Sequence, residues 1–361
     1  MSILMHQETK DMAASKQFSK AGNGLLVRAP AKINLFLLVK GKRPDGYHEL
    51  ETIMAKINWY DEILIEQKTE GKRQKTENEG QRAQGRGRPL LRRSSCEEQK
   101  TEGRGQVSIQ YPISNTECRS ETDIELICKG PYEVPEGKDN LVYKAAKLIL
   151  ETAKQGTSVK ITLTKNIPAG TGLGSGSSDA AGTLMGINRF FKLGLSKKQL
   201  AGLASQLGSD VAFFLDGPMS FCTGRGEKVQ KLPKSEFGVF LIVPDVSVST
   251  KRVYENYRHD STKYEQFHRA ISGYIKKKRI DLVSELCANM LQESCFELNT
   301  KLRELKKEIE RAGIRPVCLS GSGSSMYCII NKGNEERIVT YQNKLARKLG
   351  CKSMILNNNS W

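Results

Sequence analysis

The sequence predicts a mixed α+β protein with two lobes, on three observations. The chain has 361 residues, more than one hydrophobic core usually fills. Its first half carries segments in which apolar and polar residues alternate, as they do in half-buried antiparallel strands. Its last third shows helical periodicity, followed by two short strands around a glycine turn. This order suits an α+β fold with split lobes better than repeated βαβ units.

The N-terminal half is expected to be rich in strands. Residues Leu25–Lys40 are apolar and β-branched, and Pro30 interrupts them as at a sheet edge or bulge, which predicts two strand pieces. A turn is expected at Gly41–Gly46. The following segments Glu51–Ile57 and Glu62–Gln67 alternate apolar and polar residues and are predicted to be antiparallel strands.

A polar stretch, Lys68–Cys118, interrupts this half. It consists mainly of Lys, Arg, Glu, Gln and Gly, and the tetrapeptide Gln-Lys-Thr-Glu recurs at Gln67–Glu70, Gln74–Glu77 and Gln99–Glu102. Such a composition buries too little apolar surface to offset the entropy of ordering. We interpret the stretch as an inserted disordered loop, with an RNA-binding arm as the alternative.

Regular elements are expected to resume after the insert. The predicted strands are Asp123–Lys129, Val159–Thr164, Pro218–Thr223, Val239–Val243, Val317–Ser320 and Met326–Ile330. The predicted helices are Asp139–Lys154, Ser178–Phe191, Ser196–Gln206 with Ser196 as N-cap, and Asn334–Leu349. We therefore expect an N-terminal extension at 1–24, an N-terminal lobe at 25–190 that contains the insert at 68–118, and a C-terminal lobe at 191–361.

Composition argues against several classes of protein. The net charge of +17 is scattered, with basic and acidic residues mixed as on solvated faces, so nucleic acid is not the expected partner. The nine cysteines lack C-x-x-C pairs and zinc spacing, which predicts buried thiols in a reducing compartment. No segment resembles a signal peptide or reaches the roughly 18 apolar residues of a membrane span. We expect a soluble, cytoplasmic protein.

The strongest chemical feature is the glycine- and serine-rich segment Pro168–Ala181, between a predicted strand and a predicted helix. Its glycines leave backbone N–H groups open and permit positive φ, and the helix start favours negative charge. The alternative is a flexible turn. The residues predicted to bind phosphate are Pro168, Ala169, Gly170, Thr171, Gly172, Leu173, Gly174, Ser175, Gly176, Ser177 and Ser178.

Two familiar phosphate motifs are excluded. Gly130–Lys138 resembles a Walker loop, but its glycine spacing is too long and Asp139 stands where Ser or Thr would hold magnesium. The dinucleotide fingerprint fails because Ser177 occupies the place of its third glycine. The segment Pro168–Ala181 is thus an anion loop of another type.

A carboxylate and a lysine in apolar surroundings form the second candidate group. Asp210 lies in the apolar segment Gly208–Leu215, either as a helix N-cap or as a base that accepts a hydroxyl proton. Lys32 stands alone in an apolar strand, where it either points outward or holds Asp210 ionised. Asn34 faces the same side of that strand and is expected to bind the same ligand.

Two further segments are candidates for substrate binding. Tyr47 and His48 end a polar turn, as an aromatic platform for a base or as part of a surface turn. Ser320–Ser325 lies between two strands, as a hairpin turn or as a loop that closes over a phosphate. Gly321, Ser322 and Gly323 are its candidate binding residues.

Three of these segments, Pro168–Ala181, Gly208–Leu215 and Ser320–Ser325, resemble in order and spacing the motifs of the GHMP kinase superfamily, named for galactokinase, homoserine, mevalonate and phosphomevalonate kinases. The resemblance implies an N-terminal lobe like domain 2 of ribosomal protein S5 and a ferredoxin-like C-terminal lobe, with substrates between them. It implies ATP and Mg²⁺ as cofactors and a small-molecule alcohol as substrate. The resemblance does not assign the magnesium ligands, and Ser178 is our candidate.

Within that superfamily, Ala29–Leu35, Arg43–Leu50 and Gly224–Glu227 resemble the branch that phosphorylates a cytidine diphosphate-linked methylerythritol in non-mevalonate isoprenoid (terpenoid) biosynthesis. The resemblance runs from about Leu25 to Leu349. It departs at Thr171, Ser175 and Ala212 and in the insert, which has no counterpart.

The roles implied by this resemblance are specific. Lys32 and Asp210 would carry catalysis, with Asp210 taking the proton of the 2-hydroxyl and no phosphoenzyme formed. Asn140 would lie near adenine. Tyr47 would stack on the cytosine, His48 would hydrogen-bond its edge, and Tyr254 would be a second aromatic, with Thr250 just before it. The alternatives are a relative that acts on homoserine or mevalonate, and an RNA-binding protein that keeps only the fold.

Overall fold

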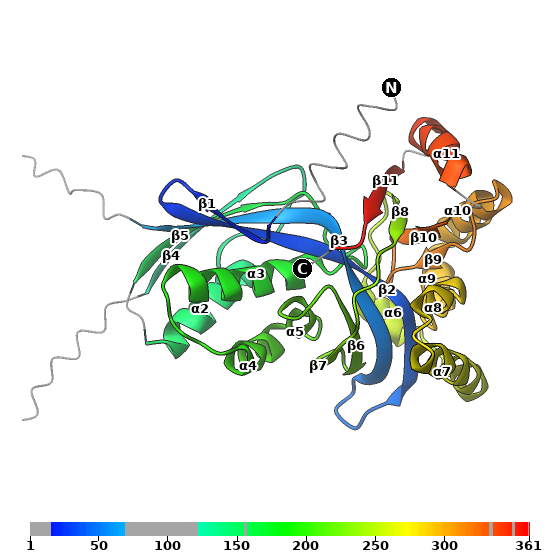
Figure 1. Cartoon of the computed structure of the whole chain (residues 1–361), viewed down its shortest axis with the longest axis horizontal. Coiled ribbons are helices and arrows are strands. Elements are labelled where there is room, and N and C mark those ends of the chain that lie inside the picture. The colour runs from blue at the N-terminus through cyan, green and yellow to red at the C-terminus, as the bar shows by residue number, and fades with distance from the viewer. Residues whose placement is uncertain (1–15, 69–121, 155–156, 332–334, 349–350, 360) are drawn as a thin grey trace, which may run out of the picture. The chain divides into compact units, whose positions relative to one another are not determined.

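The computed structural model describes residues 16–68, 122–154, 157–331, 335–348, 351–359 and 361. The predicted insert lies outside these residues, apart from Lys68. Two sheets and their helices make up the described chain (Figure 1).

The larger sheet has seven strands, and its longest members are β2 and β3. Its main order is β1–β2–β3–β5–β4, and β6 pairs with β3 and β7. The strands are β1 (Phe18–Ala21), β2 (Gly24–Lys42), β3 (His48–Gln67), β4 (Asp123–Lys129), β5 (Ser158–Thr164), β6 (Met219–Gly224) and β7 (Lys228–Lys231). Strands β1 and β7 are short and were not predicted.

Each long strand is continuous, where the sequence predicted pairs of shorter pieces. The β2–β3 pairing shifts register between Pro30 and Ala31 and at two later points. The first of these bulges accommodates the proline, so the strand continues past it. The first half of β3 pairs with β6 and its second half with β5. Both strands span the two lobes, because Val27 of β2 and Ile63 of β3 belong to one hydrophobic core, and other residues of the same strands, Leu37 and Ile53, belong to the other (Figure 1).

Four helices accompany the larger sheet: α2 (Leu141–Thr152), α3 (Ser175–Phe190), α4 (Lys197–Leu207) and α5 (Val211–Phe214). A 3₁₀ turn, Gly137–Asp139, precedes α2. Ser196 caps α4 as predicted, in a capping box with Gln199. Helix α3 lies very close to the strands, because a Cβ at Gly186 would stand 2.4 Å from Ile65 Cδ1.

The smaller sheet has four antiparallel strands in the order β11–β8–β10–β9. These are β8 (Gly238–Val243), β9 (Cys318–Leu319), β10 (Met326–Ile330) and β11 (Lys352–Asn357), of which β11 was not predicted. Its helices are α6 (Thr250–Glu255), α7 (Ser261–Lys276), α8 (Ile280–Glu285), α9 (Gln292–Leu298), α10 (Thr300–Arg311) and α11 (Glu335–Lys348).

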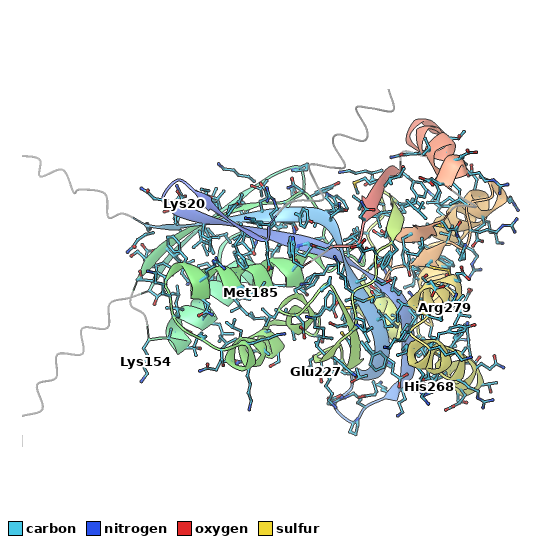
Figure 2. All side chains as sticks on the ribbon, in the orientation of Figure 1. Lys20, Lys154, Met185, Glu227, His268 and Arg279 are labelled. Atoms are coloured by element: carbon cyan, nitrogen blue, oxygen red, sulfur yellow. A yellow bond between two sulfur atoms is a disulfide. The ribbon has the colours of Figure 1, made fainter. Side chains whose placement is uncertain are left out.

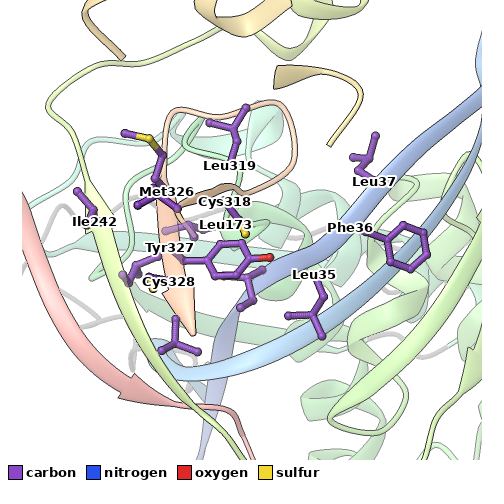
Figure 3. Close-up of a cluster of buried hydrophobic side chains, with 14 of the residues drawn as sticks. Leu35, Phe36, Leu37, Leu173, Ile242, Cys318, Leu319, Met326, Tyr327 and Cys328 are labelled. Atoms are coloured by element: carbon purple, nitrogen blue, oxygen red, sulfur yellow. The ribbon is translucent and has the colours of Figure 1, made fainter. Parts of the chain in front are cut away.

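One hydrophobic cluster joins the second half of β2 to the smaller sheet. Figure 3 shows Leu35 of β2 beside Tyr327 of β10, with Phe36 of the same cluster further away. The Tyr327 hydroxyl donates a hydrogen bond of 2.8 Å to the Asn34 carbonyl. Because the β2 backbone is bonded to the C-terminal lobe here, the side chains of Lys32 and Asn34 are held where the lobes meet.

Two cysteines differ from the expected thiols. Cys287 and Cys318 form a disulfide, although 31 residues separate them in sequence. Helices α9 and α10 lie between the two cysteines in the chain, and they bring β9 back to the segment that follows α8. The spacing of the cysteines in the sequence does not reveal that they are close in space. Cys222 and Cys295 are buried thiols, as predicted. Among the described residues, no helix is both long and apolar enough to cross a membrane.

Candidate active site

The anion loop passes directly into α3. The helix begins at Ser175, three residues before its predicted start, so Ser177 and Ser178 belong to its first turn. Gly170, Gly172 and Gly174 have φ values of 70°, 80° and 67°, a left-handed conformation that glycine adopts without strain. The segment therefore has the backbone expected of a loop that turns its N–H groups towards an anion.

The Ser320–Ser325 turn lies on this anion loop. The Ser320 hydroxyl donates to the Gly172 carbonyl at 3.0 Å, and the Ser325 amide donates to the Thr171 carbonyl at 3.0 Å. A Cβ at Gly172 would stand 2.1 Å from the Ser320 carbonyl oxygen. The two glycine-rich segments, about 150 residues apart in the chain, thus form one structure at the junction of the lobes.

Lys32 points inward, which rules out the alternative of an outward side chain. Only 4% of the residue is exposed, and its Nζ donates to Asn34 Oδ1 at 2.6 Å and lies 3.5 Å from Asp210 Oδ2. The anion loop packs on it, since a Cβ at Gly174 would be 3.0 Å from Lys32 Cε. One lysine therefore contacts the predicted base, the predicted ligand-binding amide and the anion loop.

Asp210 immediately precedes α5, but its side chain does not cap that helix. The carboxylate is about one-third exposed, and a Cβ on Gly226, in the β6–β7 hairpin, would lie 3.2 Å from its Oδ1. The N-cap alternative thus explains why Asp210 stands directly before α5, but it does not explain what the carboxylate contacts. That group faces Lys32 and remains accessible to a ligand.

Aromatic rings gather beside this pair. The His48 ring stacks on Tyr254 at 5.1 Å between centroids and meets Tyr257 edge-on at 5.9 Å. Burial is the main reason that the pKa of His48 is lowered, with Lys42 and His259 adding to the effect. The imidazole is therefore neutral at neutral pH and can accept as well as donate a hydrogen bond.

Tyr47 lies in the turn of the β2–β3 hairpin, directly before His48. Its side chain is 54% exposed, and the Arg225 guanidinium lies 4.8 Å from its ring centroid. Arg225 and Tyr257 are two contacts of the aromatic group that sequence reasoning missed. Figure 2 shows Glu227 of the β6–β7 hairpin and His268 of α7 on the two sides of these strand ends.

The remaining predicted residues are placed as follows. Thr250 shares a hydrogen bond of 2.8 Å with Ser322, which joins the start of α6 to the Ser320–Ser325 turn. Asn140 caps α2 by accepting from the Val142 amide, and it donates to the Pro135 carbonyl. The side chain of Asn140 is thus used within its own loop, and its contact with adenine stays a prediction.

A buried cluster of charged residues packs against the end of the anion loop. The sequence analysis did not predict this cluster. Lys165 follows β5 and bonds to Asp61, to Asp179 at 2.7 Å and to Ser175 at 3.1 Å. Burial raises the pKa of Asp179, against the opposing effect of Lys165. The detectable signal was a lysine directly after the strand β5 and before the anion loop.

The described residues contain no group of three or more His, Cys, Asp or Glu side chains arranged to hold a metal ion. Ser178 Oγ and Asp179 Oδ1 are buried without a hydrogen-bond partner in the described structure. Mg²⁺ commonly takes one or two protein oxygens and completes its shell with phosphate and water. Ser178, at the start of α3, fits that requirement.

Backbone amides for phosphate, with a carboxylate and a lysine at one point between two lobes, are the parts that a kinase of small alcohols needs. Comparison with known proteins leads to the same class. Residues 140–218 match the model for the GHMP kinases N terminal domain, and residues 271–346 match the model for GHMP kinases C terminal. The first match includes both the anion loop and Asp210.

Relatives that match most of the chain indicate one kind of kinase within this class. A Macrococcus caseolyticus protein named 4-diphosphocytidyl-2-C-methyl-D-erythritol kinase is 34% identical over 316 residues, which cover 86% of this chain and 92% of the relative. A Geobacillus protein of the same name is 32% identical over 308 residues, 85% of this chain and 88% of the relative. The crystal structure of a 4-(cytidine 5'-diphospho)-2C-methyl-D-erythritol kinase superposes with a TM-score of 0.61 at 26% identity, covering 92% of this chain and 98% of that one.

The chain belongs to the GHMP kinase family and, within it, groups with the 4-diphosphocytidyl-2-C-methyl-D-erythritol kinases. It is an ATP-dependent kinase with the two-lobed fold of that family.

Proposed function

We propose that this kinase transfers the γ-phosphate of ATP to the 2-hydroxyl of 4-diphosphocytidyl-2-C-methyl-D-erythritol, a step of isoprenoid biosynthesis. The names of its relatives support this substrate. The observation that carries the chemistry is the buried Lys32 Nζ, 3.5 Å from Asp210 and packed beneath the anion loop.

The proposed mechanism is a direct in-line transfer. Asp210 accepts the proton of the hydroxyl, and Lys32 stabilises the carboxylate and the negative charge that develops on the attacking oxygen. The backbone amides of Gly170–Ser178 hold the ATP phosphates in position. Mg²⁺, with Ser178 as the residue that would hold it, supplies charge neutralisation of the phosphates.

The cytidine end is proposed to bind at the rings of Tyr47, His48 and Tyr254. His48 and Tyr254 already stack, and neutral His48 is able to hydrogen-bond the edge of a cytosine. The guanidinium of Arg225 contacts the ring of Tyr47, and the next residue in the chain, Gly226, lies close to Asp210. Arg225 is therefore proposed as the cation that binds the diphosphate between the base and the methylerythritol.

Replacement of Asp210 by Asn tests the proposed base. The amide keeps the size of the side chain but accepts no proton from the hydroxyl, so kcat should fall at least about 100-fold. ADP release is measured with ATP, Mg²⁺ and the cytidyl substrate. Asp281→Asn, at an exposed surface ion pair with Arg279, is the matched control and should keep full activity.

Two outcomes would contradict the proposal. Full activity of Asp210→Asn would rule out the base. Turnover of homoserine or mevalonate in preference to the cytidyl substrate would rule out the proposed acceptor while leaving the kinase assignment intact.

A further inference from the structure

A second lysine, Lys56, lies next to Lys32. Lys32 on β2 and Lys56 on β3 are direct partners in the antiparallel pairing, so their side chains leave the same face of the sheet. The one-turn helix α5 lies against this face. Lys32 reaches Asp210 immediately before α5. Lys56 reaches the other end, where its Nζ donates to the carbonyls of Phe214 at 3.2 Å and Asp216 at 2.7 Å.

Lys56 is almost completely buried, with 1% of the residue exposed. Within the described chain no carboxylate lies within ion-pair distance of its Nζ, and the Phe213 ring centroid is 5.9 Å away. Burying an ammonium group without a charged partner is unfavourable, and burial lowers the pKa of Lys56 to about 7. An apolar side chain would fill this space without that penalty. What distinguishes a lysine here is its pair of hydrogen bonds, one to the last residue of α5 and one to Asp216 just beyond it.

Helix α5 needs support from outside itself. It has only four residues, and one turn of helix is not stable on its own hydrogen bonds. The Asp210 side chain makes no cap bond to the helix, so the carboxylate is positioned by where the helix as a whole sits. Fixing the carboxyl end of α5 therefore fixes the place of Asp210.

We propose that Lys56 is a positioning residue, which anchors the carboxyl end of α5 to β3 and thereby holds the Asp210 carboxylate beside Lys32. This inference rests on the proposed role of Asp210 as base. Lys56 itself contacts backbone carbonyls and not the reacting atoms. Since small displacements of a catalytic group reduce the rate strongly, its loss should lower kcat and leave substrate affinity unchanged.

The test is a double-mutant cycle between Lys56→Met and Asp210→Asn. Methionine has a similar length and no donor. Lys56→Met should lower kcat about tenfold, with both KM values changed less than about twofold. In the Asp210→Asn background it should change the residual rate less than about twofold, because the carboxylate is no longer there to be positioned. Lys198→Met, an exposed lysine of α4, is the matched control and should leave kcat unchanged.

The outcomes separate this inference from the proposed function. Full activity of Asp210→Asn would refute the base and the inference together. An inactive Asp210→Asn with a fully active Lys56→Met would refute only the role of Lys56. Equal losses in both backgrounds would show a general structural effect and would also refute it. Should Lys56→Met not fold, Lys56→Gln, which keeps an amide donor of shorter reach, enters the same cycle with the same criteria.

Unfolding at different pH values gives a readout independent of activity. The unfolded lysine binds its proton up to its ordinary pKa of 10.5, whereas the folded one releases it from about 7. The unfolded state thus holds more protons between these values, and stability should rise with pH there. Lys56→Met should lose this rise; an unchanged pH dependence would refute a buried amine at this position. The charged groups around it are Asp216 after α5, Lys197 of α4, Lys231 of β7, Lys32 of β2 and Asp210.

Discussion

At the scale of single residues, the rings at His48, Tyr254 and Tyr257 offer the surface on which a nucleobase is proposed to bind. One pair is stacked and the other meets edge-on, two arrangements that aromatic rings favour. Burial raises the pKa of the Tyr254 phenol, so its hydroxyl stays neutral at neutral pH. What Tyr254 offers a ligand is therefore its ring and not a charge.

Replacement of Tyr254 by Leu tests this role. Loss of a base–aromatic stack costs about 1–3 kcal/mol, so the KM for the cytidyl substrate should rise about tenfold or more, while the KM for ATP stays unchanged. Tyr254→Phe keeps the ring and should behave as the native protein. Steady-state kinetics, with each substrate varied in turn, measures the two KM values separately. A parallel rise in both KM values would contradict a base-specific contact.

At the scale of elements, the active site depends on the contact between the anion loop and the Ser320–Ser325 turn. Gly172 lies at this contact with a φ of 80°. Two hydrogen bonds join the segments, one from the Ser320 hydroxyl and one from the Ser325 amide. Because the loop comes from the first lobe and the turn from the second, this contact would set the distance between the proposed phosphate site and the proposed acceptor site.

Gly172→Ala should disrupt that contact. The added Cβ would stand 2.1 Å from a backbone oxygen that has no flexible side chain to yield, and the backbone is in the left-handed region. We expect kcat/KM for ATP to fall about 100-fold. Gly202→Ala is the matched control: its Cβ would meet nothing within 4 Å, on the exposed side of α4. It should stabilise the protein by about 0.5–1 kcal/mol and leave kinetics unchanged.

At the scale of the whole molecule, the chain leaves and re-enters the larger sheet at neighbouring points around the predicted insert. Gln67 of β3 and Asp123 of β4 flank the start of β5, where they pair with Val159 and Ser158. The Lys68 Nζ lies 2.7 Å from Asp123 Oδ2. The ends of the insert are thus about two strand spacings, or about 10 Å, apart.

A linker of about six Gly and Ser residues should therefore replace residues 69–121. Strands β3 and β4 each pair directly with β5, so we expect kcat and KM within about twofold and a Tm within about 2 °C of the full chain. Calorimetry measures the Tm, and ADP release measures kcat and KM. A large loss of activity at unchanged Tm would assign the segment a part in the reaction.

The sequence was enough to predict the anion loop, to propose Lys32 and Asp210 as the reactive pair, and to locate most strands and helices. These signals are local: glycine spacing, hydrophobic periodicity, and a charged residue inside an apolar segment. Helix α3 was predicted three residues late because Ser175 and Gly176 are poor helix formers. Strands β1 and β7 were missed because strands of four residues carry little periodicity, and β11 was missed because its apolar run is only three residues long.

Only the tertiary structure decided which way Lys32 points, that the Ser320–Ser325 turn lies on the anion loop, and that Lys56 and Lys165 are buried beneath the site. Each of these depends on contacts between segments far apart in the chain. A pattern within one segment reveals that a side chain is out of place among apolar neighbours. What that side chain meets is determined by the register of β2 against β3 and by the packing of α3 and α5 on them, which no single segment encodes.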